Sequence, residues 1–317
     1  MFHDRFATRF PPLGRNRRPE SARRRAKPLR LCQRITALAA CVAALALLLA
    51  GGKSLAAAPH PMGNPTAAEA HPSVHLVWLL AGSAIDHMAA SKGGRMLLAG
   101  PLDTPTTWLY GRSRNKPPGA TPICGGANTA AAIRAAHKPA HLILLDIEHW
   151  RFTPVAEQLH PVAAYRAAYR HVHDRRKLLI ATPAFDLIRA LRPHFHGRIY
   201  PEFLRLGLAQ KIARYADIYE IQAQGAENNT PLYRWIVRAV ARQVHVGNPH
   251  AVVLAGLSTG PSGQHVTARK LYQDVRATRR FVGGYWMNIP GKSAYCPRCG
   301  KPAPQIAIAL FRRLFHK

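Results

Sequence analysis

The sequence predicts an α/β fold, a (β/α)8 barrel of the TIM type, that follows an N-terminal signal or anchor segment. Short apolar runs alternate with amphipathic helical stretches, which is typical of βαβ units and of a parallel sheet. The region of residues 74–317 is close in length to the roughly 250 residues of a usual barrel. No glycine-rich dinucleotide fingerprint follows the first apolar run, and this disfavours a Rossmann fold.

The residues before the barrel have the pattern of an export segment. Residues 1–34 are a basic n-region, and residues 35–58 are an apolar stretch that ends in small residues, as a signal peptide does. The uncharged run of residues 35–50 is shorter than the roughly 20 residues that span a bilayer, so a cleaved signal is favoured over an uncleaved anchor. Residues 59–73, rich in proline and alanine, are predicted to be a linker. Both alternatives predict an extracytoplasmic protein, either secreted or anchored to the membrane through residues 35–50.

The barrel domain, residues 74–317, contains seven clear strand signals. The predicted strands are residues 75–81, 106–110, 141–148, 177–182, 217–224, 251–259 and 284–289. An eighth strand is either residues 95–99 or missing. Amphipathic periodicity predicts helices at residues 127–137, 161–174, 205–215, 231–246, 267–281 and 305–315.

Strand periodicity assigns two acids to the barrel interior. In residues 141–148, the side chains of Leu142, Leu144, Asp146 and Glu148 share one face, because side chains alternate across a strand. Both acids come at the C-terminal end of the strand, where barrel enzymes build their active sites. Residues two apart on a strand are separated by about 6–7 Å, so one carboxylate raises the pKa of the other. The sequence therefore predicts Asp146 and Glu148 as catalytic residues.

Other polar and aromatic side chains are expected at the same mouth. The phase of residues 217–224 points Glu220 inward, which makes it a candidate base or nucleophile. Amide and hydroxyl groups hydrogen-bond sugar hydroxyls, and aromatic rings stack on a sugar ring. The predicted substrate-binding residues are Trp150, Gln222, Gln224, Ser258, Tyr285, Trp286 and Asn288.

The Asp-x-Glu strand end, followed by Trp150, and the late Gly-Tyr-Trp strand resemble secreted (β/α)8 glycoside hydrolases, distantly the chitinase-like group. In that family the strand reads DxxDxDxE, the last Glu is the general acid, and the preceding Asp orients the substrate's acetamido group. The resemblance implies the acid role for Glu148 and the supporting role for Asp146. The two earlier acids of the pattern are replaced by Leu144 and His141. The stretches TPAFDL, IQAQGAE and GLSTGPSGQ also resemble an uncharacterised secreted barrel family, which implies no activity.

These observations predict carboxylate acid/base hydrolysis of an extracellular or cell-envelope polysaccharide. The alternative is a non-catalytic barrel that binds anionic envelope polymers, because 45 Lys and Arg oppose 15 Asp and Glu and give a net charge of +30. The two strand acids would then be paired with arginines. No nucleic-acid recognition motif accompanies the charge, so we expect no specific nucleic-acid partner. We also expect no cofactor.

Three cysteines belong to the barrel domain, namely Cys124, Cys296 and Cys299. Because an export signal implies an oxidising compartment, the first expectation is a disulfide that joins Cys124 to Cys296 or Cys299. A Cys296–Cys299 bridge is the second expectation, and a zinc site of three thiolates with one histidine is the third. The histidines lack the spacing of metal enzymes, so no catalytic metal is predicted.

Overall fold

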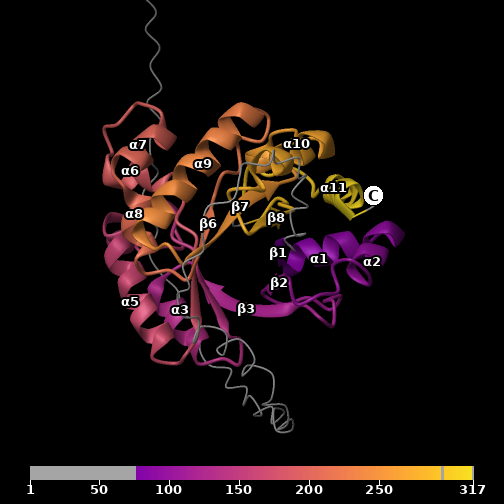
Figure 1. Ribbon diagram of the computed structural model, residues 1–317, viewed down its shortest axis with the longest axis horizontal. Helices are drawn as coiled ribbons and strands as arrows, with labels where there is room; N and C mark the ends of the chain where they lie inside the picture. Colours follow the sequence, from indigo (N-terminus) through magenta and orange to yellow (C-terminus); the bar gives the residue numbers. More distant parts are fainter. Residues whose placement is uncertain (1–75, 294–295, 316–317) are drawn as a thin grey trace, which may run out of the picture. The chain divides into compact units, whose positions relative to one another are not determined.

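The computed structural model describes residues 76–293 and 296–315, and these form a closed barrel of eight parallel strands (Figure 1). The predicted TIM-type fold is therefore confirmed. The basic n-region, the signal or anchor segment and the linker lie outside the described residues. Within the described ranges, none of the helices combines the length and apolarity needed to cross a bilayer.

The strands follow one another around the barrel in chain order, and the first pairs with the last to close it. Their bounds are β1 (Val77–Ala81), β2 (Thr107–Tyr110), β3 (Thr121–Gly126), β4 (Leu142–Leu145), β5 (Leu178–Ala181), β6 (Ile218–Ile221), β7 (Val252–Ser258) and β8 (Gly284–Asn288). Each of the seven predicted strands is present.

The eighth strand is β3, and the prediction of residues 95–99 was wrong. That segment lies mostly in helix α2 (Lys92–Leu98), whose first turn is capped by the side chain of Ser91. The β3 sequence, TPICGG, holds one proline and two glycines, which weaken the strand signal. One of the glycines is required, because a β carbon on Gly125 would lie 2.1 Å from the Leu144 carbonyl oxygen of β4.

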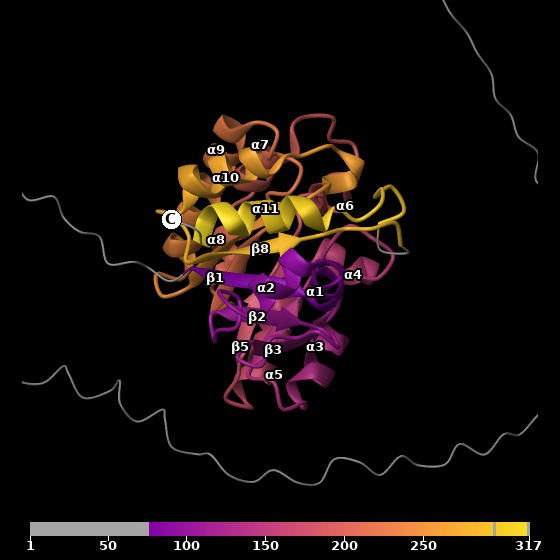
Figure 2. The same ribbon diagram turned by 90° about the vertical axis from the view of Figure 1, so that its right-hand side faces the viewer.

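Helices lie outside the ring of strands, and α11 lies beside the closing strands β8 and β1 (Figures 1 and 2). The helices besides α2 are α1 (Gly82–Ala89), α3 (Thr129–Ala136), α4 (Val155–Leu159), α5 (Pro161–His173), α6 (Leu187–Leu191), α7 (Ile199–Arg205), α8 (Leu208–Ala213), α9 (Thr230–Gly247), α10 (Ala268–Thr278) and α11 (Pro304–Phe315). All six predicted helices are present. The short helices α1, α2, α4, α6 and α7 were not predicted.

The longest helix, α9, shows how the sequence specifies these elements. The side chain of Asn229 accepts a hydrogen bond from the Leu232 backbone N–H at 3.0 Å, and Pro231 occupies the first turn. Buried side chains then recur three and four residues apart, which gives the helix one apolar face against the barrel. They are Tyr233, Ile236, Val237, Val240, Ala241 and Val244.

Two apolar layers confirm the predicted strand phase. Leu142 and Leu144 of β4 belong to the cluster that fills the barrel, whereas Ile143, Leu145 and Ile147 belong to the layer between strands and helices. The next two inward positions on this strand are those of the predicted acids. The fold therefore carries both acids to the carboxyl end of the barrel, above an apolar plug.

Candidate active site

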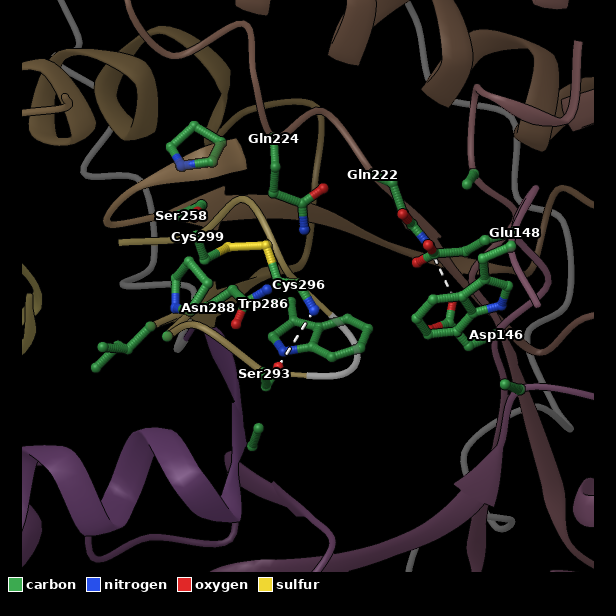
Figure 3. A pocket seen from close by; sticks show the side chains of 18 of the residues that line it. Asp146, Glu148, Gln222, Gln224, Ser258, Trp286, Asn288, Ser293, Cys296 and Cys299 are labelled. Atoms are coloured by element: carbon green, nitrogen blue, oxygen red, sulfur yellow. Dashed lines mark hydrogen bonds between the residues drawn. A yellow bond between two sulfur atoms is a disulfide. The ribbon is translucent and has the colours of Figure 1, made fainter. Parts of the chain in front are cut away.

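An open cavity of about 1640 Å³ lies at the carboxyl ends of the strands. Eight of the ten predicted catalytic and substrate-binding residues line it, together with two of the three cysteines. They are Asp146, Glu148, Trp150, Gln222, Gln224, Ser258, Trp286, Asn288, Cys296 and Cys299. Figure 3 shows the acids and Gln222 on one side, and Trp286, Asn288 and the cysteines on the other. The structure thus brings together residues from β4, β6, β7 and β8.

Asp146 is held by two neutral donors from adjacent strands. The Thr182 hydroxyl and the Gln222 side-chain amide donate to its Oδ1 atom at 2.9 Å and 2.8 Å. Gln222 also donates to the Thr182 carbonyl oxygen, so the three side chains form one network. Burial raises the pKa of Asp146 to about 7, and the charge of Asp186 adds to this rise while the two hydrogen bonds oppose it.

Glu148 lies two residues after Asp146, on the same face of the chain, and is half-buried. Burial, followed by the charges of Asp146 and Asp186, raises the pKa of Glu148 well above its usual value. Its carboxyl group lines the cavity, and the raised pKa favours its protonated form. A protonated carboxyl in such a position is able to act as a general acid.

A third acid, Asp186, also lines the cavity and was not predicted as a site residue. Its Oδ1 atom accepts a hydrogen bond from the His149 backbone N–H at 3.0 Å. This contact ties the segment after β5 to the turn that follows Glu148. The cavity therefore holds three carboxyl groups, of which two, Asp146 and Glu148, directly follow β4.

Trp150 is positioned by Thr153, a buried residue behind it. The indole Nε1 donates to the Thr153 hydroxyl at 2.8 Å, and the backbone N–H of Glu148 donates to the same oxygen at 3.3 Å. The hydroxyl in turn donates to the Ala127 carbonyl oxygen at 2.7 Å. One threonine thus fixes both the predicted acid and an aromatic wall of the cavity.

The opposite wall is built around Trp286 of β8. Its ring meets Tyr110 of β2 edge to face, with 6.1 Å between the centroids. Within the described residues, its buried Nε1 atom has no hydrogen-bond partner. Ser258 at the end of β7 is fixed from behind, since its backbone N–H donates to Glu227 Oε1 at 2.9 Å.

Glu220 faces the barrel interior as predicted, but it does not line the cavity. It is fully buried, and within the described chain neither carboxyl oxygen has a hydrogen-bond partner. Burial and the nearby charge of Asp146 raise the pKa of Glu220 well above its usual value. The prediction that Glu220 contacts a substrate was therefore wrong. Glu220 lies two residues before Gln222 on the same face of the chain, deeper in the barrel, and is fully buried.

Tyr285 is the second correction. It lies on the helix-facing side of β8, where its ring stacks on Trp78 at 5.4 Å. Its hydroxyl shares a hydrogen bond with Thr278 and donates to the Val275 carbonyl oxygen of α10. The predicted substrate contact was wrong because Tyr285 has the opposite strand phase to Trp286.

The third correction concerns the cysteines. Cys296 and Cys299 are joined by a disulfide with 5.3 Å between their α carbons, whereas Cys124 is a free, half-buried thiol. The expected bridge from Cys124 was wrong because Cys124 lies within β3 and its side chain packs against the layer under the helices. The second expectation, a Cys296–Cys299 bridge, is the one that the structure contains. Across the described ranges, no three His, Cys, Asp or Glu side chains are grouped to hold a metal ion.

Sequence reasoning missed several residues that line the cavity or support it from below, although some signals were present. Thr182 closes the predicted strand at residues 177–182, and Tyr110 closes the one at residues 106–110. Both are polar groups at strand ends, which is the pattern that identified Asp146. Asp186 had no such signal, because it comes from a loop whose path the sequence does not specify.

No known family profile matches this chain, and no curated protein matches it. A glycoside hydrolase family 18 chitinase from Pseudoalteromonas aurantia matches at 10% identity and a TM-score of 0.34, over 55% of this chain and 68% of that chain. Triosephosphate isomerase from Bartonella henselae matches at 10% identity and a TM-score of 0.39, over 74% and 98% of the two chains. The carboxyl transferase domain of Rhizobium etli pyruvate carboxylase matches at 13% identity and a TM-score of 0.37, over 75% and 40%. Similarities this low assign no activity to the chain.

Proposed function

We propose that this protein is a glycoside hydrolase that cleaves an extracellular or cell-envelope polysaccharide with Glu148 as the general acid. The observation that carries the proposal is that Glu148, a carboxyl group with a raised pKa, lines an open cavity together with Asp146 and Asp186. Burial and two neighbouring acids hold the pKa of Glu148 well above its usual value, so it donates a proton to a departing glycosidic oxygen.

Asp146 is the electrostatic partner in this proposal. Its pKa of about 7 lies near neutrality, and Thr182 and Gln222 fix the orientation of its carboxyl group. The resemblance to chitinase-like enzymes supports the same division of roles, with Asp146 orienting an acetamido group of the substrate.

The cavity walls supply what a sugar chain requires. Trp150 and Trp286 offer aromatic surfaces on opposite sides, and Gln224, Ser258 and Asn288 offer hydrogen-bonding groups. Sugar sites combine such flat apolar surfaces with a few directed polar groups. An extracytoplasmic location is part of the proposal, and the Cys296–Cys299 disulfide supports it, because disulfides persist in oxidising compartments.

Turnover by the Glu148→Gln variant tests the proposal. The amide keeps the size of the side chain but has no acidic proton, so hydrolysis across a panel of chitin, peptidoglycan, cellulose and xylan should fall by about 10²–10⁴-fold. Glu157→Gln is the matched control, because Glu157 lies on α4 outside the cavity and its partner, the Thr129 N–H, still meets an acceptor. Equal turnover by the wild type and Glu148→Gln would contradict the assignment.

A second candidate function has one observation in its favour. Four cationic side chains line the cavity, and within the described residues none of them forms an ion pair with an acid. They are Arg189, Lys292, Arg298 and Lys301. Such a rim favours an anionic polymer, which the protein would bind without cleaving. Retention on cell-wall material that is lost at high salt and unchanged in an Asp146→Asn, Glu148→Gln variant would favour this function.

A further inference from the structure

A second hollow lies beside the candidate active site and is lined by residues from the start of α7 and the first half of α9. The two helices are neighbours in the fold (Figure 1). The volume of the hollow is about 540 Å³, and it is lined by Arg198, Ile199, Tyr200, Pro201, Leu232 and Trp235. The last two lie three residues apart on one face of α9, and Trp235 is 44% exposed. Leu232 is 36% exposed as well, so the two side chains form a contiguous apolar patch beside the hollow, and such patches mark binding surfaces. We name this feature the α7–α9 groove.

The α7–α9 groove adjoins the active-site cavity. Ile199 and Tyr200 line both. Tyr200 is also braced from the cavity side, because its ring meets Phe185 edge to face at 4.8 Å, and Phe185 lines the cavity. Tyr200 is therefore the side chain that a polymer extending from the cavity to Trp235 would pass.

The size and chemistry of the groove select its occupant. Six residues line the groove, far fewer than the roughly 20–30 residues that each side of a stable protein interface contributes. It offers the faces of Trp235 and Tyr200 and the aliphatic surfaces of Leu232 and Pro201, with Arg198 at its edge. A pyranose ring presents an apolar face to such a platform and keeps its hydroxyl groups in water.

We propose that the α7–α9 groove is a distal sugar-binding subsite that holds the part of a polysaccharide chain extending out of the active-site cavity. This inference rests on the proposed glycosidase function and assigns a long-chain polymer as its substrate. Trp235 is the stacking platform, and Tyr200 is the junction between subsite and cavity. Short oligosaccharides fill the cavity alone and do not reach Trp235.

Iodide quenching of tryptophan fluorescence tests the subsite directly. Of the five tryptophans of the chain, Trp235 is the most exposed, so iodide quenches it preferentially. In the Glu148→Gln protein, which binds without cleaving, hexasaccharides of chitin, cellulose and xylan are the probes. At least one of them should shield Trp235 from iodide, whereas the matching disaccharide should not.

Substitution gives the second readout. Trp235→Ala should weaken hexasaccharide binding about tenfold, the loss of one stacked ring, and leave disaccharide binding unchanged. Met96→Ala, which removes another exposed apolar side chain outside both hollows, is the control. Shielding by none of the hexasaccharides, or equal hexasaccharide affinity with and without Trp235, would overturn the inference.

The two proposals fail in different ways. If Trp235 is shielded but Glu148→Gln hydrolyses polysaccharide as fast as the wild type, the subsite stands and the proposed catalytic role falls. If Glu148→Gln is inactive but Trp235 stays open to iodide, the catalytic role stands and the subsite falls.

Discussion

At the scale of single residues, buried acids dominate this otherwise very basic protein. Asp146, Glu227 and Asp274 all have a pKa of about 7 because burial disfavours their charged forms. Glu227 has a structural role, because its carboxyl group accepts hydrogen bonds from the backbone N–H groups of Gly225 and Ser258. Glu227 thereby connects the segment that follows β6 to the end of β7.

The coupling between Asp146 and Glu148 predicts a shift in the pH profile. The negative charge of Asp146 raises the pKa of Glu148, so Asp146→Asn should lower that pKa. The alkaline limb of kcat/KM, where Glu148 loses its proton, should move to lower pH in this variant. A series of kcat/KM measurements against pH checks this. An alkaline limb at the same pH in both proteins would contradict the assignment of Glu148 as the acid.

Asp274 predicts a pH-dependent difference in stability. Its pKa rises from 3.8 to about 7 on folding, so its contribution is fully present below about pH 4 and is lost as the pH rises toward 7. Asp274→Asn cannot ionise and escapes this loss. The free energy of unfolding of the variant should therefore gain on that of the wild type by about 1.4 kcal/mol per pH unit in this window.

Urea denaturation at several pH values measures the difference. Asp174→Asn, a change of the same kind at an exposed position, should show no such trend. Parallel stability curves for Asp274→Asn and the wild type would mean that Asp274 is not neutral in the folded protein.

At the scale of elements, the sequence predicted seven strands because each is a short apolar run, and the alternation of side chains along each run assigned residues to the barrel interior or to the helix-facing side. In β4 and β6 the same alternation that separated Asp146 from Ile147 also separated Glu220 from Tyr219. Sequence reasoning missed β3, because its proline and two glycines weaken the strand signal. This strand is recognised by its pairing with β2 and β4. The alternation also shows which side chains face the barrel interior but not how deep they lie. For this reason Glu220 was expected to line the cavity, which it does not.

The segment after β8 is the element that the sequence could not place. Residues 289–293, Cys296 and residues 298–302 line the cavity, and the Cys296–Cys299 disulfide constrains this wall. Which thiols pair depends on the face that Cys124 takes in β3, and that face is set by a strand the sequence did not reveal.

The disulfide predicts a local effect. The two cysteines are three positions apart in the sequence, so the disulfide closes a very short loop. Because the stabilisation by a disulfide grows with loop length, replacing both residues by Cys296→Ser and Cys299→Ser should lower the free energy of unfolding by about 2 kcal/mol at most. The wall that the disulfide constrains contacts substrate in our proposal, so KM should rise while kcat changes little. Thermal unfolding and steady-state kinetics of the double variant measure both. A fall in kcat at unchanged KM would contradict this role, and Cys124→Ser is the control because Cys124 lies outside the cavity.

At the scale of the whole molecule, charge and fold serve different purposes. The net charge of +30 favours contact with anionic surfaces, whereas the chemistry proposed for the cavity depends on a few of the 15 acids among 317 residues. Three of those acids meet at the carboxyl end of one barrel. The fold class was predictable because it follows from repeated alternation along the chain, whereas the α7–α9 groove was not, because it joins residues from helices with no shared pattern.

The central claim is that Glu148 protonates the departing oxygen, and the dependence of turnover on the leaving group tests it most directly. The phenolate of an aryl glycoside with an acidic phenol leaves with little help from a proton donor. A sugar hydroxyl group of a polysaccharide leaves only when its oxygen is protonated. Glu148→Gln should therefore lose about 10²–10⁴-fold in kcat/KM on a polysaccharide and at most about tenfold on the aryl glycoside of the same sugar. Equal losses on both substrates would contradict the account.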